Sequence, residues 1–465
     1  MTGAKGVVGV VIDEGPRDWQ ILQRRANGTV DIAVSGRWGS EETACGVDVR
    51  LVNEDDGAAV TADLDWTAVR TRPDGTWSGV LKDVPTGGLY RLETHLRTAG
   101  NPAIEWSQRG DMRHFLGVGD LWVIAGQSNS AGYGRGPCPD PPQLGVHVLN
   151  NAMRWALATQ PLNESTDTAH PVNREQANSG HSPWLQFAKQ VRAATGLPIG
   201  LVQTSLGGSP LAAWDPASGA AAVLFDNMVR VVEAAGGKVR GVLWYQGESD
   251  AGGEQAKSYE RRFVSAVRAW RKALKSPDLH VLTVQINRNF VPPDEPADRG
   301  WSRVREAERR IPHRLKNVTV VPTLDLGLSD GIHVSPRGNL LLGERAARTV
   351  LGAVYGVPLD ALAPEPATAR RFRAGKVIEI AFDNVSSRIE CIDPTSVPFR
   401  VEDAAGWVDV ERVQYTGGHK VRLHLARAAS GRTVVHGAFG RNPPTVPCDM
   451  VRMMPMLGFY DFPVK

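Results

Sequence analysis

Hydrophobic and polar residues alternate along the first part of the chain, up to about residue 115. The alternation is clearest in 30–34, 47–51 and 90–96. Because successive side chains of a strand point to opposite faces, a period of two predicts strands with one buried face. Turn residues separate these stretches, as in 73–75 and 86–88. No stretch of helical period interrupts them, so residues 1–115 are predicted to form an N-terminal β-sandwich domain.

The pattern changes between residues 116 and 355, where short apolar runs are nearly continuous. These runs occupy residues 121–125, 199–202, 239–245, 281–286 and 318–321. Such runs predict strands covered on both faces, as in a parallel sheet. Helical spacing lies between them, at i, i+3, i+4 and i+7 from Trp184 and at i, i+4, i+7 and i+11 from Phe263. The alternation predicts an α/β domain over residues 116–355, with a five-stranded parallel sheet between layers of helices.

Residues 356–465 return to the strand pattern. The segments 377–382 and 421–425 are strand-like, and Gly417-Gly418 is a turn. A linker is expected around Pro364 and Pro366. The predicted fold class is therefore α/β, with a central domain flanked by N-terminal and C-terminal β-sandwich-like domains.

Composition narrows the classes of protein and of partner. The 465-residue chain has 42% hydrophobic and 22% charged residues, which is typical of a globular protein. No apolar run approaches the roughly 18 to 20 residues of a membrane-spanning helix, so no membrane partner is expected. A net charge of +3, scattered along the chain, does not indicate nucleic-acid binding. None of these features determines the oligomeric state.

The cysteines and the N-terminal sequence bear on metal sites, disulfides and localisation. The four cysteines include no C-x-x-C pair, which argues against a zinc or redox site. Cys391 and Cys448 could pair with each other or remain separate buried thiols. The short N-terminal apolar run is broken by Asp13 and Glu14, which is not typical of a secretory signal. The protein is expected in the cytoplasm, or secreted or periplasmic if a signal has been removed.

Four segments follow predicted strands of the central domain, at the edge where open α/β sheets bind ligands. The first is Gly126-Gln127-Ser128-Asn129. A serine at a strand-to-helix turn exposes its hydroxyl for attack, and its own N–H can point at a developing oxyanion. The same sequence is also common as a plain turn. Its glycines do not match G-x-G-x-x-G, so dinucleotide binding is not indicated.

The second segment, Asp330-Gly331-Ile332-His333, could supply the base that a serine nucleophile needs. Histidine titrates near neutral pH, and a carboxylate in the same loop can hold its imidazole. The alternative is an ordinary surface loop. A helix expected from Pro336 onwards favours the pair of Asp330 and His333.

Two more strand ends carry possible hydrogen-bond donors. The amide of Gln246 would suit an oxyanion hole, although residues 248–250 would equally suit a helix N-cap. The segment 205–208 contains Gly207 and Gly208. Glycine lets a backbone N–H approach a substrate closely, or simply makes a tight turn.

Together these segments resemble the SGNH hydrolases, specifically the sialate O-acetylesterase and carbohydrate acetylesterase family. The resemblance implies a flavodoxin-like α/β/α fold and a serine esterase that needs no cofactor and no metal. It makes Ser128 the nucleophile, His333 the general base and Asp330 the residue that orients His333. It also implies an oxyanion hole formed by the N–H groups of Ser128 and Gly207 and by the side chain of Gln246.

Further residues beside these segments are candidates for binding the substrate or supporting the site. They are Gln127, Asn129, Glu248, Trp214, Trp184 and Arg135. Tryptophan can stack on a sugar ring, although most of the 13 tryptophans are expected in the core. Arg135 could bind a sialate carboxylate, or it could be a solvated loop residue.

The expected activity is removal of O-acetyl groups from sugars, either sialates or plant or bacterial polysaccharides, through an acetyl-enzyme. Two alternatives remain. A lipase or thioesterase on the same fold would need an apolar groove, whereas loops 132–140 and 209–219 are polar and rich in Gly and Pro. A non-catalytic carbohydrate-binding protein would have no need of the serine, the histidine and their partners together.

Overall fold

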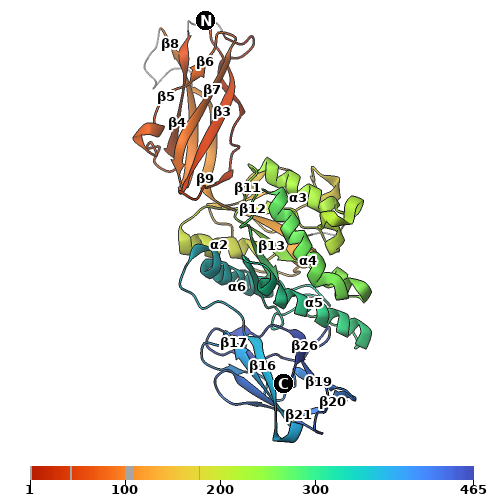
Figure 1. The fold of residues 1–465 in the computed structure, drawn as a ribbon. Helices are drawn as coiled ribbons and strands as arrows, with labels where there is room; N and C mark the ends of the chain where they lie inside the picture. Colours follow the sequence, from red (N-terminus) through yellow and green to blue (C-terminus); the bar gives the residue numbers. More distant parts are fainter. Residues whose placement is uncertain (1–2, 42–43, 100–108, 177–178) are drawn as a thin grey trace.

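The computed structural model describes residues 3–41, 44–99, 109–176 and 179–465. They form three regions that follow one another in space as they do in the chain (Figure 1). The N-terminal and C-terminal regions are built of strands, and helices α1 to α6 belong to the middle region. Within the described residues, no helix is both long enough and apolar enough to cross a membrane.

Two β-sheets share one apolar core in the N-terminal region. The strands are β1 (Gly9–Glu14), β2 (Ile21–Gln23), β3 (Thr29–Gly39), β4 (Ala44–Asn53), β5 (Thr67–Ala68), β6 (Arg70–Thr71), β7 (Thr76–Pro85), β8 (Gly87–Thr98) and β9 (Arg109–Gly126). One sheet has the order β1-β3-β7-β6, and the other joins β4, β5 and β8 to β9. Side chains from both sheets build the core, among them Trp38, Leu51, Trp77 and Leu92. The stretches with a period of two are strands β3, β4 and β8, as predicted.

Strand β9 runs from the N-terminal region into the centre of the molecule. Its first half pairs with β8, and its second half lies between β12 and β13. The expected boundary between residues 115 and 116 therefore falls inside one strand. Residues 111–115 are half-buried and residues 116–126 are buried. Leu116 and Val118 still belong to the core of the N-terminal region, whereas the residues from Leu121 onwards belong to the core of the middle region.

The central sheet has the order β11-β10-β12-β9-β13-β14-β15. Its remaining strands are β10 (Val146–Leu149), β11 (Trp155–Leu157), β12 (Ile199–Gln203), β13 (Gly241–Tyr245), β14 (His280–Val284) and β15 (Val318–Val321). Within the described residues, six of the strands run parallel and β11 pairs antiparallel at the edge. The prediction of a five-stranded, purely parallel sheet is therefore wrong. It misses β10, where His147 interrupts the apolar residues, and β11, which has only 3 residues.

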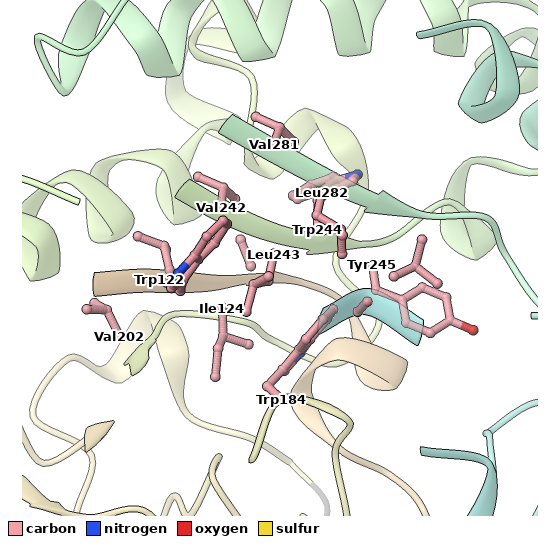
Figure 2. Close-up of a cluster of buried hydrophobic side chains, with 14 of the residues drawn as sticks. Trp122, Ile124, Trp184, Val202, Val242, Leu243, Trp244, Tyr245, Val281 and Leu282 are labelled. Carbon is pink, nitrogen blue, oxygen red and sulfur yellow. The ribbon is translucent and has the colours of Figure 1, made fainter. Parts of the chain in front are cut away.

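Helices pack on both faces of this sheet. They are α1 (Ser128–Ala131), α2 (Trp184–Thr195), α3 (Val223–Ala234), α4 (Gly253–Ala273), α5 (Glu295–Arg314) and α6 (Pro336–Tyr355). On one face Trp122 of β9 contacts Phe187 of α2. On the other face Trp244 of β13 contacts Phe263 and Trp270 of α4. Figure 2 shows Trp122 and Trp244 on adjacent strands within the buried cluster. The helices expected from Trp184 and Phe263 are present, and the middle region is α/β as predicted.

Short 3₁₀ helices complete the chain. They are η1 (Ala62–Leu64), η2 (Pro171–Asn173), η3 (Leu211–Ala213), η4 (Pro216–Ala221), η5 (Glu248–Asp250) and η6 (Arg373–Gly375). Of these, η5 lies directly beyond the end of β13, so it borders the carboxyl edge of the sheet.

The C-terminal region again consists of strands around one apolar core. They are β16 (Glu365–Phe372), β17 (Val377–Asp383), β18 (Ile389–Glu390), β19 (Phe399–Asp403), β20 (Gly406–Val408), β21 (Val410–Tyr415), β22 (Lys420–Leu425), β23 (Val434–Gly437), β24 (Cys448–Asp449), β25 (Met454–Pro455) and β26 (Phe459–Pro463). The linker expected around Pro366 overlaps strand β16, which is a correction. Pro366 is accommodated because β16 lies at a sheet edge and has an irregular register between Pro366 and Thr368.

Cys391 and Cys448 are free thiols in the part of the chain that the structure describes. Burial raises the pKa of the Cys448 thiol to about 12. Of the two possibilities left open by the sequence, the structure therefore shows separate thiols.

Replacing Trp244 with alanine tests the packing of the central core. The side chain is completely buried against Phe263 and Trp270. We expect Trp244→Ala to lower the free energy of unfolding by about 3–5 kcal/mol, because it leaves a large cavity. Urea unfolding monitored by circular dichroism measures the change. Val80→Ala, at a side chain that is 48% exposed, should change stability by less than about 0.5 kcal/mol; equal effects of both substitutions would contradict the expectation.

Candidate active site

Ser128 begins helix α1 directly after β9 ends. Gly126 makes this turn with a φ of +117°, and a Cβ there would lie 2.2 Å from the carbonyl oxygen of Tyr245. Any side chain at this position would push β9 away from β13. The turn places Ser128 at the carboxyl edge of the sheet. Among the described residues, the N–H of Ser128 has no hydrogen-bond acceptor, as is usual in the first turn of a helix.

The imidazole of His333 lies between Ser128 and Asp330. Its Nε2 is 3.0 Å from Oγ of Ser128, and its Nδ1 is 2.7 Å from Oδ2 of Asp330. The N–H groups of Ile332 and His333 donate to Oδ1 of Asp330 at 2.9 and 2.7 Å. Burial raises the pKa of Asp330, but these N–H groups and the imidazole outweigh it, so the pKa lies below the ordinary value. The structure thus brings together a hydroxyl, a base and a carboxylate in the order that nucleophilic catalysis requires.

Asn129 fastens the loop of His333 to the start of α1. Its Oδ1 accepts the N–H of Val334 at 3.0 Å, and its Nδ2 donates to Oε1 of Glu248 at 2.8 Å. Burial raises the pKa of Glu248, and hydrogen bonds such as the one from Asn129 only partly offset it. The ring of Tyr133 packs beside the imidazole, with 5.0 Å between the ring centres. These contacts leave His333 little freedom to rotate away from Ser128.

The side-chain amide of Gln246 bonds to neighbouring protein groups. The residue is completely buried, and its Nε2 donates to Oδ2 of Asp250 at 2.7 Å and to the carbonyl of Ser209 at 3.2 Å. An amide nitrogen has two hydrogens, so neither is free for an oxyanion. The expected oxyanion role of Gln246 therefore disagrees with the geometry. The reason is that a buried amide must satisfy its own hydrogen bonds, and this one does so with the residues around it.

The N–H of Gly207 also has a partner. It donates to Oε1 of Glu175 at 2.8 Å, and the hydroxyl of Tyr133 donates to Oε2 of the same carboxylate at 2.7 Å. An oxyanion could use the Gly207 N–H only by taking the place of Glu175. Neither Tyr133 nor Glu175 stands out in the sequence. Tyr133 could have been noticed as an aromatic residue in the loop after the serine, whereas Glu175 lies in a loop without a recognisable pattern.

The two tryptophans expected to face a sugar lie in the core instead. Trp184 and Trp214 are completely buried. Nε1 of Trp184 donates to the carbonyl of Ser130 at 3.0 Å, and Nε1 of Trp214 donates to Oγ of Ser209 at 3.1 Å. They lie beside the motifs because the helices pack on the sheet there. The prediction that they contact a sugar is therefore wrong.

Arg135 and Gln127 have different surroundings. Arg135 is exposed, and its Cζ lies 5.4 Å from the centre of the Tyr133 ring. Gln127 is buried, and its Oε1 accepts the N–H of Ser249 at 3.1 Å. Gln127 therefore joins the ends of β9 and β13, while Arg135 stays available at the rim.

A polar cavity of about 410 Å³ adjoins Glu175. Its lining includes Glu164, Ser165, Thr166, Arg174, Gln176 and Ser179. Hydroxyl, amide and charged groups dominate the lining, which gives an acyl chain little apolar surface to cover. Among the described residues, no group of three or more His, Cys, Asp or Glu is arranged to hold a metal ion.

Gln246→Ala tests whether this amide is structural. We expect a loss of about 1–3 kcal/mol in stability, because buried partners such as Asp250 lose a hydrogen bond. The kcat per folded molecule should fall less than about tenfold, whereas loss of an oxyanion donor costs roughly 10²- to 10³-fold. Thermal melting and esterase assays measure the two quantities. A kcat loss of about 100-fold or more would instead show that Gln246 serves as an oxyanion donor.

Comparison with known proteins identifies the family. A family model described as "Carbohydrate esterase, sialic acid-specific acetylesterase" matches residues 118–352. A probable carbohydrate esterase of Arabidopsis thaliana is 28% identical over 255 residues, which cover 50% of this chain and 90% of that protein. The crystal structure of a carbohydrate acetylesterase from Xanthomonas citri is 23% identical, has a TM-score of 0.69 and covers 97% of this chain and 99% of that one. The last similarity shows that the fold is shared over nearly the whole chain. The family model matches half of the chain and contains all the site segments, so this protein belongs to the sialic acid-specific acetylesterase family of carbohydrate esterases.

Proposed function

We propose that this carbohydrate esterase hydrolyses O-acetyl esters of sugars by a serine mechanism, with Ser128 as nucleophile, His333 as base and Asp330 as its orienting carboxylate. The observation that carries the proposal is the pair of contacts of His333. Nε2 lies 3.0 Å from Oγ of Ser128 while Nδ1 lies 2.7 Å from Oδ2 of Asp330. Because Asp330 is an acceptor at Nδ1, Nδ1 carries the proton and Nε2 has its lone pair directed at the hydroxyl.

In the first half of the reaction, Nε2 of His333 accepts the proton of Ser128 as Oγ bonds to the acetyl carbonyl carbon. The positive charge on the imidazolium is stabilised by Asp330, whose lowered pKa keeps it ionised. The tetrahedral intermediate then loses the sugar oxygen, which takes the proton from Nε2. In the second half, water replaces the sugar, and the same steps release acetate and restore Ser128.

Negative charge on the tetrahedral oxygen needs hydrogen-bond donors. The N–H of Ser128 supports this role, since it has no acceptor among the described residues and lies at the N-terminus of α1. The N–H of Gly207 joins it when the substrate oxygen takes the place of the Glu175 carboxylate, which is 2.8 Å away in the free protein. Gln246 has a structural role, because its hydrogen bond to Asp250 holds the loop between β13 and α4 in place.

An acetylated carbohydrate fits the surroundings of the site. The polar cavity is not lined by Ser128 or His333, but it is lined by Glu175, whose carboxylate accepts the N–H of Gly207. Its polar groups suit sugar hydroxyl groups better than an acyl chain. The family model is described as sialic acid-specific, and Arg135 is an exposed cation beside Tyr133 that suits a sialate carboxylate. We therefore propose O-acetyl sialates or acetylated polysaccharides that carry a carboxylate as the preferred substrates.

We also propose that the chain consists of three domains, at residues 1–115, 116–355 and 356–465. Separate apolar cores in the three regions support this division. The two β-rich domains are proposed to be β-sandwich-like, since each has sheets that share one core. Strand β9 makes the first boundary a continuous connection rather than a flexible linker.

Ser128→Ala tests the mechanism. We expect the rate of acetate release from p-nitrophenyl acetate and from acetylated sugars to fall by at least about 10³-fold, because alanine has no hydroxyl to form the acetyl-enzyme. Asp330→Asn should lower kcat by roughly 10²- to 10⁴-fold, because His333 loses the acceptor that sets its tautomer.

Ser130→Ala is the matched control for Ser128. This serine lies in the same helix, but its Oγ donates to the carbonyl of Ala125 at 2.8 Å. The same Oγ accepts a hydrogen bond from Nε1 of Trp184 at 3.0 Å. Ser130→Ala should keep activity within about tenfold of the wild type, since only these two neutral hydrogen bonds are lost. Full activity of a folded Ser128→Ala protein would refute the serine mechanism.

Arg135→Ala tests the charge preference. We expect kcat/KM for O-acetyl sialic acid to fall about tenfold, the effect of losing one charge-assisted hydrogen bond, and kcat/KM for a neutral acetylated xylo-oligosaccharide to stay unchanged. Acetate release is measured for both substrates at equal ionic strength. Equal losses on both would exclude Arg135 as a reader of the carboxylate.

A further inference from the structure

A buried arginine connects the C-terminal region to a loop beside the active site. Arg305 lies on α5 and is completely buried. Burial lowers the pKa of its guanidinium to about 9. Within the described residues, the guanidinium bonds to no carboxylate and donates to main-chain carbonyls instead. A buried charge without a paired carboxylate is costly, so these carbonyl contacts are what holds it in the interior.

The carbonyls belong to two segments that are far apart in the sequence. Nε and Nη2 donate to Ile286 and Asn287 at 2.9 and 2.6 Å, in the loop after β14. Nη1 donates to Ala438 and Gly440 at 3.2 and 2.5 Å, in the loop after β23 of the C-terminal region. The planar guanidinium has five donors in a fixed geometry, so one side chain holds both loops at once.

The loop after β14 in turn contacts the loop of His333. Nδ2 of Asn287 donates to the carbonyl of Ile332 at 2.9 Å. The N–H of Phe290 donates to the carbonyl of Gly331 at 2.7 Å. These two carbonyls belong to the residues directly before His333. Hydrogen bonds through Arg305 and the loop after β14 therefore connect the C-terminal region to the backbone directly before His333.

We propose that Asn287 is a positioning residue for His333, and that Arg305 brings the C-terminal region into this role by holding residues 286–287 against residues 438–441. The inference rests on the proposed function, because it needs His333 to be the base. Nε2 and Oγ of Ser128 are 3.0 Å apart, at the distance for proton transfer. A shift of the loop by about 1 Å would break this contact, and misplacements of that size reduce rates by roughly 10²-fold.

Asn287→Ala in the full-length protein is the test. We expect kcat to fall roughly 10- to 100-fold with KM changed less than about twofold, because the base moves while the substrate contacts stay. The rate at which a fluorophosphonate probe labels Ser128 should fall by a similar factor, since labelling needs the same base. A merely structural role would lower the melting temperature and leave both rates per folded molecule unchanged.

Arg299→Ala is the matched control. Arg299 lies on the same helix and joins it to the C-terminal region, through Glu402 at 3.1 Å and the hydroxyl of Tyr460 at 3.1 Å. These bonds do not involve residues 286–290. We expect a lower melting temperature with unchanged kcat and labelling rate. Arg305→Lys keeps the charge and loses the fork of donors, so it should lower both rates as Asn287→Ala does.

The outcomes separate this inference from the proposed function. Wild-type kcat and labelling rate in Asn287→Ala would overturn the inference and leave the serine mechanism intact. Equal losses of kcat in Arg299→Ala would also overturn it, because the effect would then belong to the whole contact between α5 and the C-terminal region. If Asn287→Ala does not fold, Arg305→Lys decides by the same two rates. Activity that survives Ser128→Ala would overturn both proposals.

Discussion

The course of strand β9 is the constraint on which the rest of the structure depends. The strand begins in the N-terminal sheet, passes between β12 and β13, and ends at the glycine before the site. There Gly126 approaches the backbone of Tyr245 more closely than any side chain allows. The N–H of Gln127 then donates to the Tyr245 carbonyl at 2.9 Å, so the position of Ser128 is set by the sheet itself. Ser128, the proposed nucleophile, is therefore held by one of the most completely buried parts of the molecule.

His333, the proposed base, lies 205 residues further along the chain than Ser128, and polar groups around its imidazole fix the distance between the two side chains. Asn129 accepts a hydrogen bond from the N–H of Val334 in the loop of His333, and Asp330, which belongs to the same loop, bonds to the imidazole. The amide of Asn129 is buried, and its Nδ2 also donates to Oε1 of Glu248 at 2.8 Å. Leaving one such group without a partner costs about 1–3 kcal/mol, so each bond in the network discourages alternative loop positions. Stability and alignment of the reacting atoms thus depend on the same hydrogen bonds.

Glu175 and the loop after β14 show how other parts of the chain enter the site. Glu175 comes from the long connection between β11 and α2, and its carboxylate occupies the N–H of Gly207 in the free protein. Asn287 comes from the connection between β14 and α5 and contacts Ile332. Both contacts join loops that only the sheet order brings together, because β12, β14 and β15 all end at the same edge.

The sequence by itself determined the class of fold and brought out the residues that are proposed to react. Period-two stretches, apolar runs and helical spacing are local signals. They located β3, β4 and β8, helices α2 and α4, and the parallel strands β9, β12, β13, β14 and β15. Ser128 at a strand end and Asp330 three residues before His333 are equally local, since one turn and one loop suffice to define them. Tertiary structure alone decided the two short strands β10 and β11, the burial of Trp184 and Trp214, and the hydrogen bond of Gln246 to Asp250. It also decided the presence of Tyr133, Glu175 and Asn287 at the site. The physical reason is that burial and hydrogen-bond partners depend on which distant segments pack together, and no spacing within one segment records that.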